Sequence, residues 1–265
     1  MFAALLHGKL DRYLTRNPFD IEDLLTSVVI GACRCVPPDL ALLPFLGTAT
    51  PLDRESLSPL LEGVERVEYE FWPQWGALLR DASDAMDADG PVMLAARSEP
   101  EVVLTLHRAN QPKALLLLEA KLHSGKSSHA DGTSGLKDQL AKYWGQLSSR
   151  ANHSGAVPLG VVYITTHHLM PRYELGQSQE DLRNHGFEDA SIFWTSWRAF
   201  SKVVTSEVSP LDECKALLRK HWELVPIEEP RPWCRPPKIP PWQPARFRPW
   251  WSPPHVRAWK YGPNS

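Results

Sequence analysis

The segment that decides the fold reads Glu99-Pro-Glu-Val-Val-Leu-Thr-Leu106 and, after a short polar loop, Ala114-Leu-Leu-Leu-Leu-Glu-Ala-Lys121. The unbroken apolar run before Glu119 is typical of a central strand that is buried on both faces. The apolar residues after Glu101 predict a second strand, antiparallel to the first. The start of one strand then lies beside the end of the next, so Glu101 and Glu119 are expected close together at one edge of the sheet.

Two adjacent carboxylates repel each other unless a cation lies between them, and oxygen-rich sites of this kind suit Mg²⁺ or Mn²⁺. Lys121 follows Glu119 by two residues and so projects from the same face of the strand. An ammonium beside a metal can orient a water, help to deprotonate it, or neutralise the charge of a phosphorane. Glu99 is a competing ligand, which we rank below Glu101.

A single acid-x-Lys triplet is weak evidence, because composition alone gives roughly one match in a chain of this length. A second match, Glu213-Cys214-Lys215, lies in a predicted amphipathic helix, where charged side chains are normally solvated. Glu119 differs because five apolar residues precede it, so its carboxylate emerges from a core strand. The simpler interpretation of Glu119 and Lys121 is a salt bridge at a strand end.

Further elements flank this strand pair on both sides. Before it, the spacing of apolar residues predicts a helix at about 21–33 and a half-buried strand at 64–72. After it come an amphipathic helix beginning at Leu136 and further strands and helices, at 159–165, 191–194 and 209–222. The order helix, three strands, helix, strand, helix, strand, helix predicts an α/β fold with a mixed central sheet flanked by helices.

Three motifs in this order resemble those of the PD-(D/E)XK nuclease superfamily. They are Pro100-Glu101, then Glu119-Ala-Lys121, then Gln139-Leu-Ala-Lys-Tyr143 on the following helix. The last is similar to the Gln-x-x-x-Tyr motif of the exonuclease-like and CRISPR-associated branches. The resemblance covers roughly residues 17–165 and implies a restriction-endonuclease-like αβββαβ core.

The resemblance implies a metal-dependent nuclease that hydrolyses phosphodiester bonds, with DNA as the expected substrate. Its context would be bacterial restriction, repair or anti-phage defence. Glu101, Glu119 and the carbonyl of Ala120 would hold Mg²⁺ or Mn²⁺. Glu22 is either a further ligand or simply the N-terminal acid of a helix. Because Glu101 replaces the family's usual aspartate, the geometry must adjust and activity could be weak or lost.

The same resemblance assigns roles to three other side chains. Lys121 would assist the nucleophile. Gln139 and Tyr143 share one helix face and would contact substrate phosphates or orient the lysine. The alternative for this pair is a helix with a core-packing tyrosine.

The loop after Lys121 is rich in Gly, Ser and Lys. It lacks the first glycine of a nucleotide-binding phosphate loop, because position 120 is alanine, so a nucleotide hydrolase is disfavoured. We expect Lys126 and Ser127 to hold nucleic-acid phosphate instead. His167-His168 follows a predicted strand end and can approach the site, although loop histidines are usually just solvated.

The formal net charge of −2 is a cancellation between two parts of the 265-residue chain. Residues 226–265 contain 12 of the 25 prolines, 5 of the 11 tryptophans, and 7 Lys or Arg against 2 Glu, so they carry +5. Residues 1–225 contain 22 basic and 29 acidic residues, hence −7. Such proline density forbids helices and central strands, so we expect an extended Pro/Trp-rich C-terminal arm on a nuclease-like domain, 1–225.

Partners and location follow from the same composition. We expect the arm to dock on the domain, on a second copy of the chain or on a partner subunit; the alternative is a basic aromatic strip that stacks on single strands. No apolar run approaches the roughly 18 residues of a membrane span, and the four cysteines form no disulfide framework, which predicts a cytoplasmic protein. The acidic domain and Glu101 also leave room for a non-catalytic binding module that keeps the fold.

Overall fold

The computed structural model describes residues 22–53, 56–75, 99–122, 125–126, 136–205 and 207–225. The chain divides into two units, residues 1–227 and 228–265, and every described residue belongs to the first unit. Ser127 and the arm at 226–265 lie outside the described residues, so the expectations about them stay predictions.

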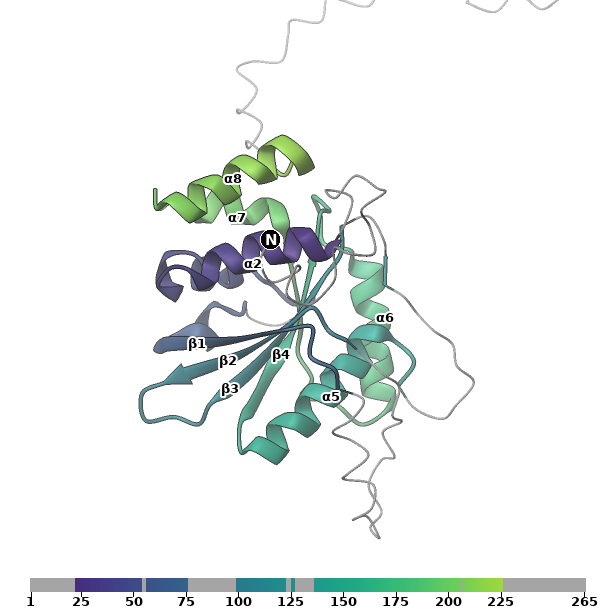
Figure 1. Ribbon diagram of the computed structural model, residues 1–265. Helices are drawn as coiled ribbons and strands as arrows, with labels where there is room; N and C mark the ends of the chain where they lie inside the picture. Colours follow the sequence, from purple (N-terminus) through teal and green to yellow (C-terminus); the bar gives the residue numbers. More distant parts are fainter. Residues whose placement is uncertain are drawn as a thin grey trace, which may run out of the picture. The chain divides into compact units, whose positions relative to one another are not determined.

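A five-stranded mixed sheet forms the centre of the fold (Figure 1). Its strands are adjacent in the order of the chain: β1 (Val64–Phe71), β2 (Val102–Arg108), β3 (Ala114–Ala120), β4 (Val157–Thr165) and β5 (Ile192–Ser196). The first three strands are antiparallel to one another, whereas β4 runs parallel to β3 and β5 parallel to β4. β3 is the middle strand and every one of its residues is buried, as its apolar run predicts.

Helices cover both faces of this sheet. On one face lie α2 (Glu22–Arg34), α3 (Leu42–Gly47), α7 (Trp197–Val203) and α8 (Ser209–Trp222); on the other lie α5 (Gln139–Ser154) and α6 (Arg172–Asn184) (Figure 1). Two single-turn 3₁₀ helices, η3 (Pro38–Leu40) and η4 (Ser58–Leu61), lie between α2 and β1 in the chain. Among the described helices, none has the length and apolar character needed to cross a membrane.

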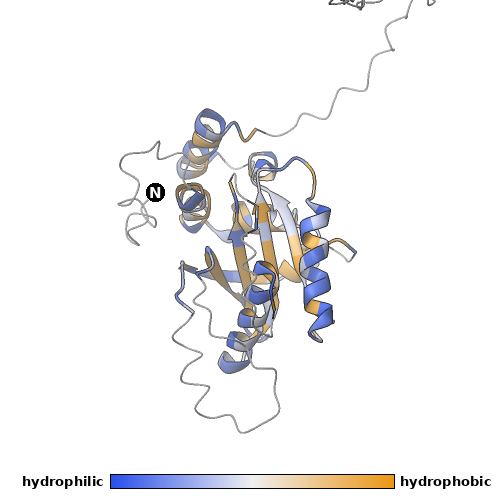
Figure 2. Cartoon of the chain, turned by 90° about the vertical axis from the view of Figure 1, so that its right-hand side faces the viewer, coloured by the Kyte–Doolittle hydropathy of each residue, from blue (hydrophilic) through white to orange (hydrophobic). Residues whose placement is uncertain are grey.

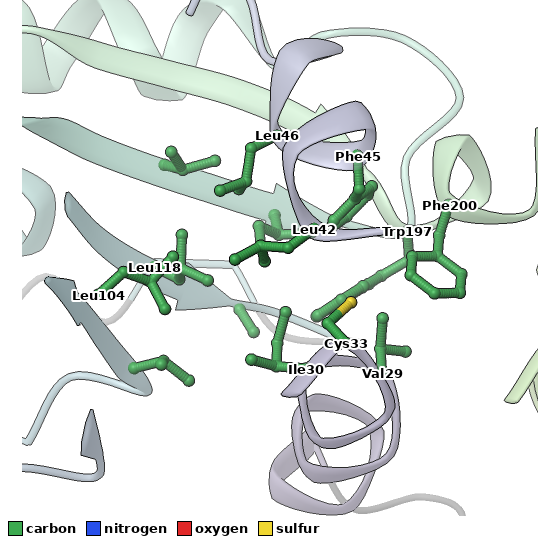
Figure 3. Close-up of a cluster of buried hydrophobic side chains, with 14 of the residues drawn as sticks. Val29, Ile30, Cys33, Leu42, Phe45, Leu46, Leu104, Leu118, Trp197 and Phe200 are labelled. Atoms are coloured by element: carbon green, nitrogen blue, oxygen red, sulfur yellow. The ribbon is translucent and has the colours of Figure 1, made fainter. Parts of the chain in front are cut away.

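Alternation of side chains along the strands produces two apolar cores, one on each face of the sheet. Leu104 and Leu118 project into the core beneath α2, α3 and α7, which also contains Trp197, stacked on Phe45 (Figure 3). Leu117 and Tyr163 project to the opposite face, into the core beneath α5 and α6. Figure 2 shows the apolar strands enclosed by helices whose outer surfaces are hydrophilic. A strand between two cores requires apolar residues at every position, which explains the sequence of β3.

The predicted α/β class, the mixed sheet and the order of the main elements are confirmed. The helix expected from Leu136 begins instead at Gln139, because the Asp138 carboxylate accepts the Leu140 and Ala141 amides at 2.9 and 3.3 Å and so caps the helix there. The short helices α3 and α7 were not predicted. Each has only one or two turns, too few for a periodic pattern to stand out.

Gly160 provides a test of how closely β4 approaches β5. A Cβ atom added there would lie 2.6 Å from Phe193 Cε2 and 2.8 Å from the carbonyl oxygen of Ser191, and the backbone oxygen cannot move aside. We expect Gly160→Ala to reduce the free energy of unfolding by about 1–3 kcal/mol in urea titrations.

Gly176→Ala is the matched control, because this glycine lies inside α6 with nothing within 4 Å of the added methyl group. It should leave stability unchanged or raise it by about 0.5–1 kcal/mol, since alanine favours the helix. Equal effects of the two substitutions would contradict the close contact between the strands.

Candidate active site

The register of β2 and β3 brings two carboxyl groups to one end of the sheet. Val102 is paired with Leu118 in antiparallel fashion, so the next residues outward, Glu101 and Glu119, stand opposite each other. Residues in this relation have Cβ atoms about 4.5–5.5 Å apart and side chains on the same face. Both side chains are buried, with Glu101 7% and Glu119 2% exposed. Glu99, the competing candidate, is exposed.

Trp72 fixes the position of Glu101. Its indole Nε1 donates to Glu101 Oε2 at 3.0 Å, and its backbone amide donates to the Glu101 carbonyl at 2.9 Å. Trp72 follows directly after β1 and has φ of 46°, a left-handed conformation that is rare for a bulky residue. Backbone strain of this kind, roughly 1–3 kcal/mol, persists where the surrounding structure determines it and is found frequently at functional sites. Here it turns the indole back onto the carboxyl group of the neighbouring strand.

Lys121 connects Glu119 to the first helix. Its ammonium lies 2.9 Å from Glu119 Oε1 and 2.9 Å from Glu22 Oε1, and the lysine side chain is 12% exposed. The second carboxylate oxygen of Glu22 accepts the backbone amide of Leu122 at 2.9 Å. Glu22 therefore holds the end of β3 through two adjacent residues. Both of its oxygens are engaged by the protein, which favours a positioning role for Glu22 over the role of metal ligand.

The start of α5 brings Gln139 and Tyr143 to the same carboxyl group. Gln139 Nε2 donates to Glu119 Oε1 at 2.7 Å and lies 3.2 Å from the Tyr143 hydroxyl. The spacing of four residues places both side chains on one face of the helix, directed at the sheet. The glutamine therefore orients Glu119, whereas the carboxylates of Glu119 and Glu22 orient the lysine.

Burial dominates the electrostatics of the site. It raises the pKa of Glu119 to about 7, although the Lys121 ammonium acts in the opposite direction. Burial and then the charge of Glu119 raise the pKa of Glu101 well above its ordinary value. Burial lowers the pKa of Lys121, but the carboxylates of Glu119 and Glu22 outweigh it and raise that pKa above the ordinary value. The lysine therefore stays protonated. Its single positive charge is not enough to stabilise both buried acids in their ionised form.

Two observations bear on whether a metal ion fits here. The buried oxygen Glu119 Oε2 has no hydrogen-bond partner among the described residues, although Oε1 has two. The Ala120 carbonyl points toward the β2 side, because it belongs to the same trans peptide group as the Lys121 amide. That amide donates to β4, and the C=O and N–H of a trans peptide point in opposite directions. The register places Pro100 opposite Ala120, and proline has no amide hydrogen to offer. Beside Glu101, one carboxylate oxygen thus has no partner among the described residues, and the Ala120 carbonyl has no ladder amide opposite it.

These donors suit Mg²⁺ or Mn²⁺, which bind through one or two carboxylates and complete their shells with water and substrate phosphate. Among the residues that the structure describes, no group of three or more His, Cys, Asp or Glu side chains is arranged to hold a metal. The protein would therefore supply only part of a shell.

Lys126 does not match its expected role. Its ammonium lies 2.5 Å from Asp138 Oδ2, 2.5 Å from the Glu174 carbonyl and 2.8 Å from the Ser178 hydroxyl, and the side chain is 6% exposed. Three acceptors account for its three hydrogens, so in this arrangement the lysine joins the start of α5 to α6 and has no donor for a phosphate. We correct the expectation of phosphate binding at this residue.

Several residues at the site were not identified from the sequence. Asp23 lies near enough to Glu101 to raise its pKa, and Trp72 and Asp138 hold Glu101 and the start of α5. Asp138 carried a readable signal, because an aspartate immediately before a helical stripe is a preferred N-cap. The contact of Trp72 with Glu101 spans 29 residues and left no local pattern.

The raised pKa of Glu119 predicts how stability depends on pH in the metal-free protein. Between the ordinary value of 4.5 and the folded value of about 7, the folded state keeps a proton that the unfolded chain releases. The contribution of Glu119 is therefore present below pH 4.5 and is lost as pH rises through 7, by up to about 3 kcal/mol.

Glu119→Gln removes this contribution. In urea titrations with a chelator present, the stability of the variant relative to the parent should rise between pH 4.5 and pH 7. Glu213→Gln, on the surface of α8, serves as the control and should show no such change. A difference between Glu119→Gln and the parent that does not vary with pH would contradict the assignment.

Comparison with protein-family models, with curated proteins and with solved structures finds no match for this chain. The side chains around Glu101 and Glu119 are therefore the basis on which a function can be argued.

Proposed function

We propose that this protein is a metal-dependent nuclease of the PD-(D/E)XK type, which hydrolyses phosphodiester bonds in nucleic acid, with DNA as the first candidate. The observation that carries the proposal is the pair of buried, opposed carboxyl groups at the end of β2 and β3, with an ammonium at hydrogen-bond distance from one of them. Buried acids with raised pKa values that share a charge partner are more frequent at functional sites than elsewhere.

The order of the elements supports the same proposal. A helix, three antiparallel strands, a second helix and a parallel strand occur in the order that the nuclease resemblance implies. The three motifs lie at the expected elements: Glu101 immediately before β2, Glu119 near the end of β3, and Gln139 at the start of α5.

Glu101, Glu119 and the carbonyl of Ala120 would hold the metal ion. When bound, Mg²⁺ or Mn²⁺ would lower the pKa of a coordinated water and withdraw charge from the scissile phosphate. Trp72 and Gln139 each donate to one of the two carboxylates, so both are held in place before any ion arrives. Preorganised ligands of this kind reduce the cost of binding.

Lys121 acts in this proposal as a fixed positive charge. Since Glu22 and Glu119 raise its pKa, the lysine stays protonated at neutral pH and cannot accept a proton from water. It can donate to the attacking water or to a phosphate oxygen, whose negative charge increases as the new bond forms. Glu22 is a positioning residue here, because it contacts the lysine and the adjacent backbone.

Tyr143 and Gln139 line the side of the site formed by α5. Burial, and next the charge of Glu119, raise the pKa of Tyr143, so its hydroxyl stays protonated at neutral pH. It can therefore donate a hydrogen bond to a phosphate oxygen. Gln139 keeps Oε1 of Glu119 occupied, which leaves Oε2 for the ion.

The second acid-x-Lys triplet provides a matched control for a cleavage assay. With Mg²⁺ and a labelled DNA substrate, we expect Glu119→Gln or Lys121→Met to lower the rate about 10²–10³-fold or more. The first removes a proposed metal ligand, and the second removes a positive charge that stabilises the transition state. Glu213→Gln and Lys215→Met change the same residue types on α8, where Glu213 is exposed and Lys215 half-buried, and should leave the rate unchanged.

Lys121→Met also leaves two carboxylates without their partner, so circular dichroism must show that the variant is folded. If folded Glu119→Gln cuts as fast as the parent, the proposed site is wrong. If the parent itself cuts no DNA or RNA with either metal, the protein is better described as a binding module that keeps the fold.

Metal binding has a readout that does not require activity. A ligand that binds only the folded state raises the free energy of unfolding, by about 2.7 kcal/mol at a hundredfold excess over Kd. We expect Mg²⁺ or Mn²⁺ to raise the melting temperature of the parent and of Glu213→Gln. Glu101→Gln and Glu119→Gln should lose most of this shift; an equal shift in all four proteins would place the metal elsewhere.

A further inference from the structure

A cavity of about 250 Å³ adjoins the site on the β4 side. Lys121 forms part of its wall, together with residues that follow β3, residues that follow β4 and one residue of α6: Leu122, Gly125, Thr165, Thr166, His167 and Glu174. The cavity lies at the carboxyl ends of two parallel strands, which is where ligands bind in open α/β sheets. Because Lys121 belongs to both, a group bound in the cavity would lie next to the proposed cleavage point.

Internal hydrogen bonds hold the walls of this cavity. Thr166 Oγ1 donates to the Leu122 carbonyl at 2.9 Å, which ties the segment after β4 to the segment after β3. Thr165 Oγ1 accepts from Trp194 Nε1 at 3.0 Å. Glu174 Oε2 accepts from the Tyr163 hydroxyl at 3.0 Å, and its backbone carbonyl accepts from Lys126. The structural role of Lys126 is thus to fix one wall.

The size of the cavity limits what it can hold. Its volume corresponds to about eight water molecules at about 30 Å³ each, which is enough for one nucleobase. A base enters a pocket of this kind only after it has left the stack, and that step costs least in single strands and frayed ends.

The chemistry of the wall selects among bases. Glu174 is a carboxylate, which only accepts hydrogen bonds when ionised, and one of its oxygens is already bonded to Tyr163. A carboxylate in this position favours a base that offers an exocyclic amino group, as cytosine does at N4. Thymine has nearly the same size but presents an acceptor there.

We propose that this cavity binds the unpaired base next to the scissile phosphate, with Glu174 accepting a hydrogen bond from the amino group of the base. The inference rests on the proposed nuclease function and deepens it, because it names single-stranded or frayed DNA as the substrate class and amino-bearing bases as the preferred ones.

The probes are the mononucleotides dCMP and dTMP, titrated by calorimetry into the full chain with Mg²⁺ present. Neither contains a phosphodiester bond, so binding is measured independently of cleavage. We expect dCMP to bind the parent at least about fivefold more tightly than dTMP. Glu174→Gln keeps an acceptor for Tyr163 but adds donors, so it should reduce or reverse the preference. Glu180→Gln, an exposed residue of the same helix, should preserve it.

A second pair of variants tests the cavity independently, in case Glu174→Gln does not fold. His167 lines the cavity and the adjacent His168 is exposed and does not, so His167→Ala should weaken binding of both nucleotides whereas His168→Ala should not.

Equal affinity of the parent for dCMP and dTMP, undetectable binding of dCMP, or a preference that survives Glu174→Gln would overturn the assignment of the cavity. These results can be distinguished from a failure of the nuclease proposal. Selective dCMP binding without any cleavage would contradict the nuclease activity and support the base-binding cavity. Cleavage without selective binding would support the nuclease activity and contradict the base-binding cavity.

Discussion

The burial of two carboxyl groups at one end of a strand pair is the constraint on which the rest of the site depends. The register of β2 and β3 sets Glu101 against Glu119, and burial raises the pKa of both. Lys121 supplies one positive charge, which it shares with Glu22. Buried ion clusters seldom improve stability over apolar side chains of similar volume. Their presence on the middle strand of the sheet is therefore better explained by a function than by folding.

The neighbouring residues hold these acids in one arrangement. Trp72 binds Glu101 from β1, Gln139 binds Glu119 from α5, and neither side chain covers Glu119 Oε2. A cation at that oxygen would relieve both the missing hydrogen bond and the shortage of positive charge. The proposals for metal binding, cleavage and the adjoining cavity all follow from this one arrangement.

Much of this could be predicted from the sequence because the relevant signals are local. The apolar run that ends at Glu119 indicates a buried strand, and a hairpin brings Glu101 beside it without any knowledge of distant residues. Contacts between distant segments could not be predicted. The indole of Trp72 and the acceptors of Lys126 come together only through tertiary packing. A Gly/Ser/Lys-rich loop is equally typical of phosphate binding and of an internal anchor, so Lys126 was assigned wrongly.

We propose above that Glu101 and Glu119 bind one metal ion between them. Anomalous scattering from crystals grown with Mn²⁺ tests this claim most directly, because the position of the ion is read without reference to any activity. We expect a peak roughly 2.0–2.3 Å from an oxygen of each carboxylate and from the carbonyl of Ala120. A map with no peak there, while Lys121 still bridges Glu119 and Glu22, would contradict it.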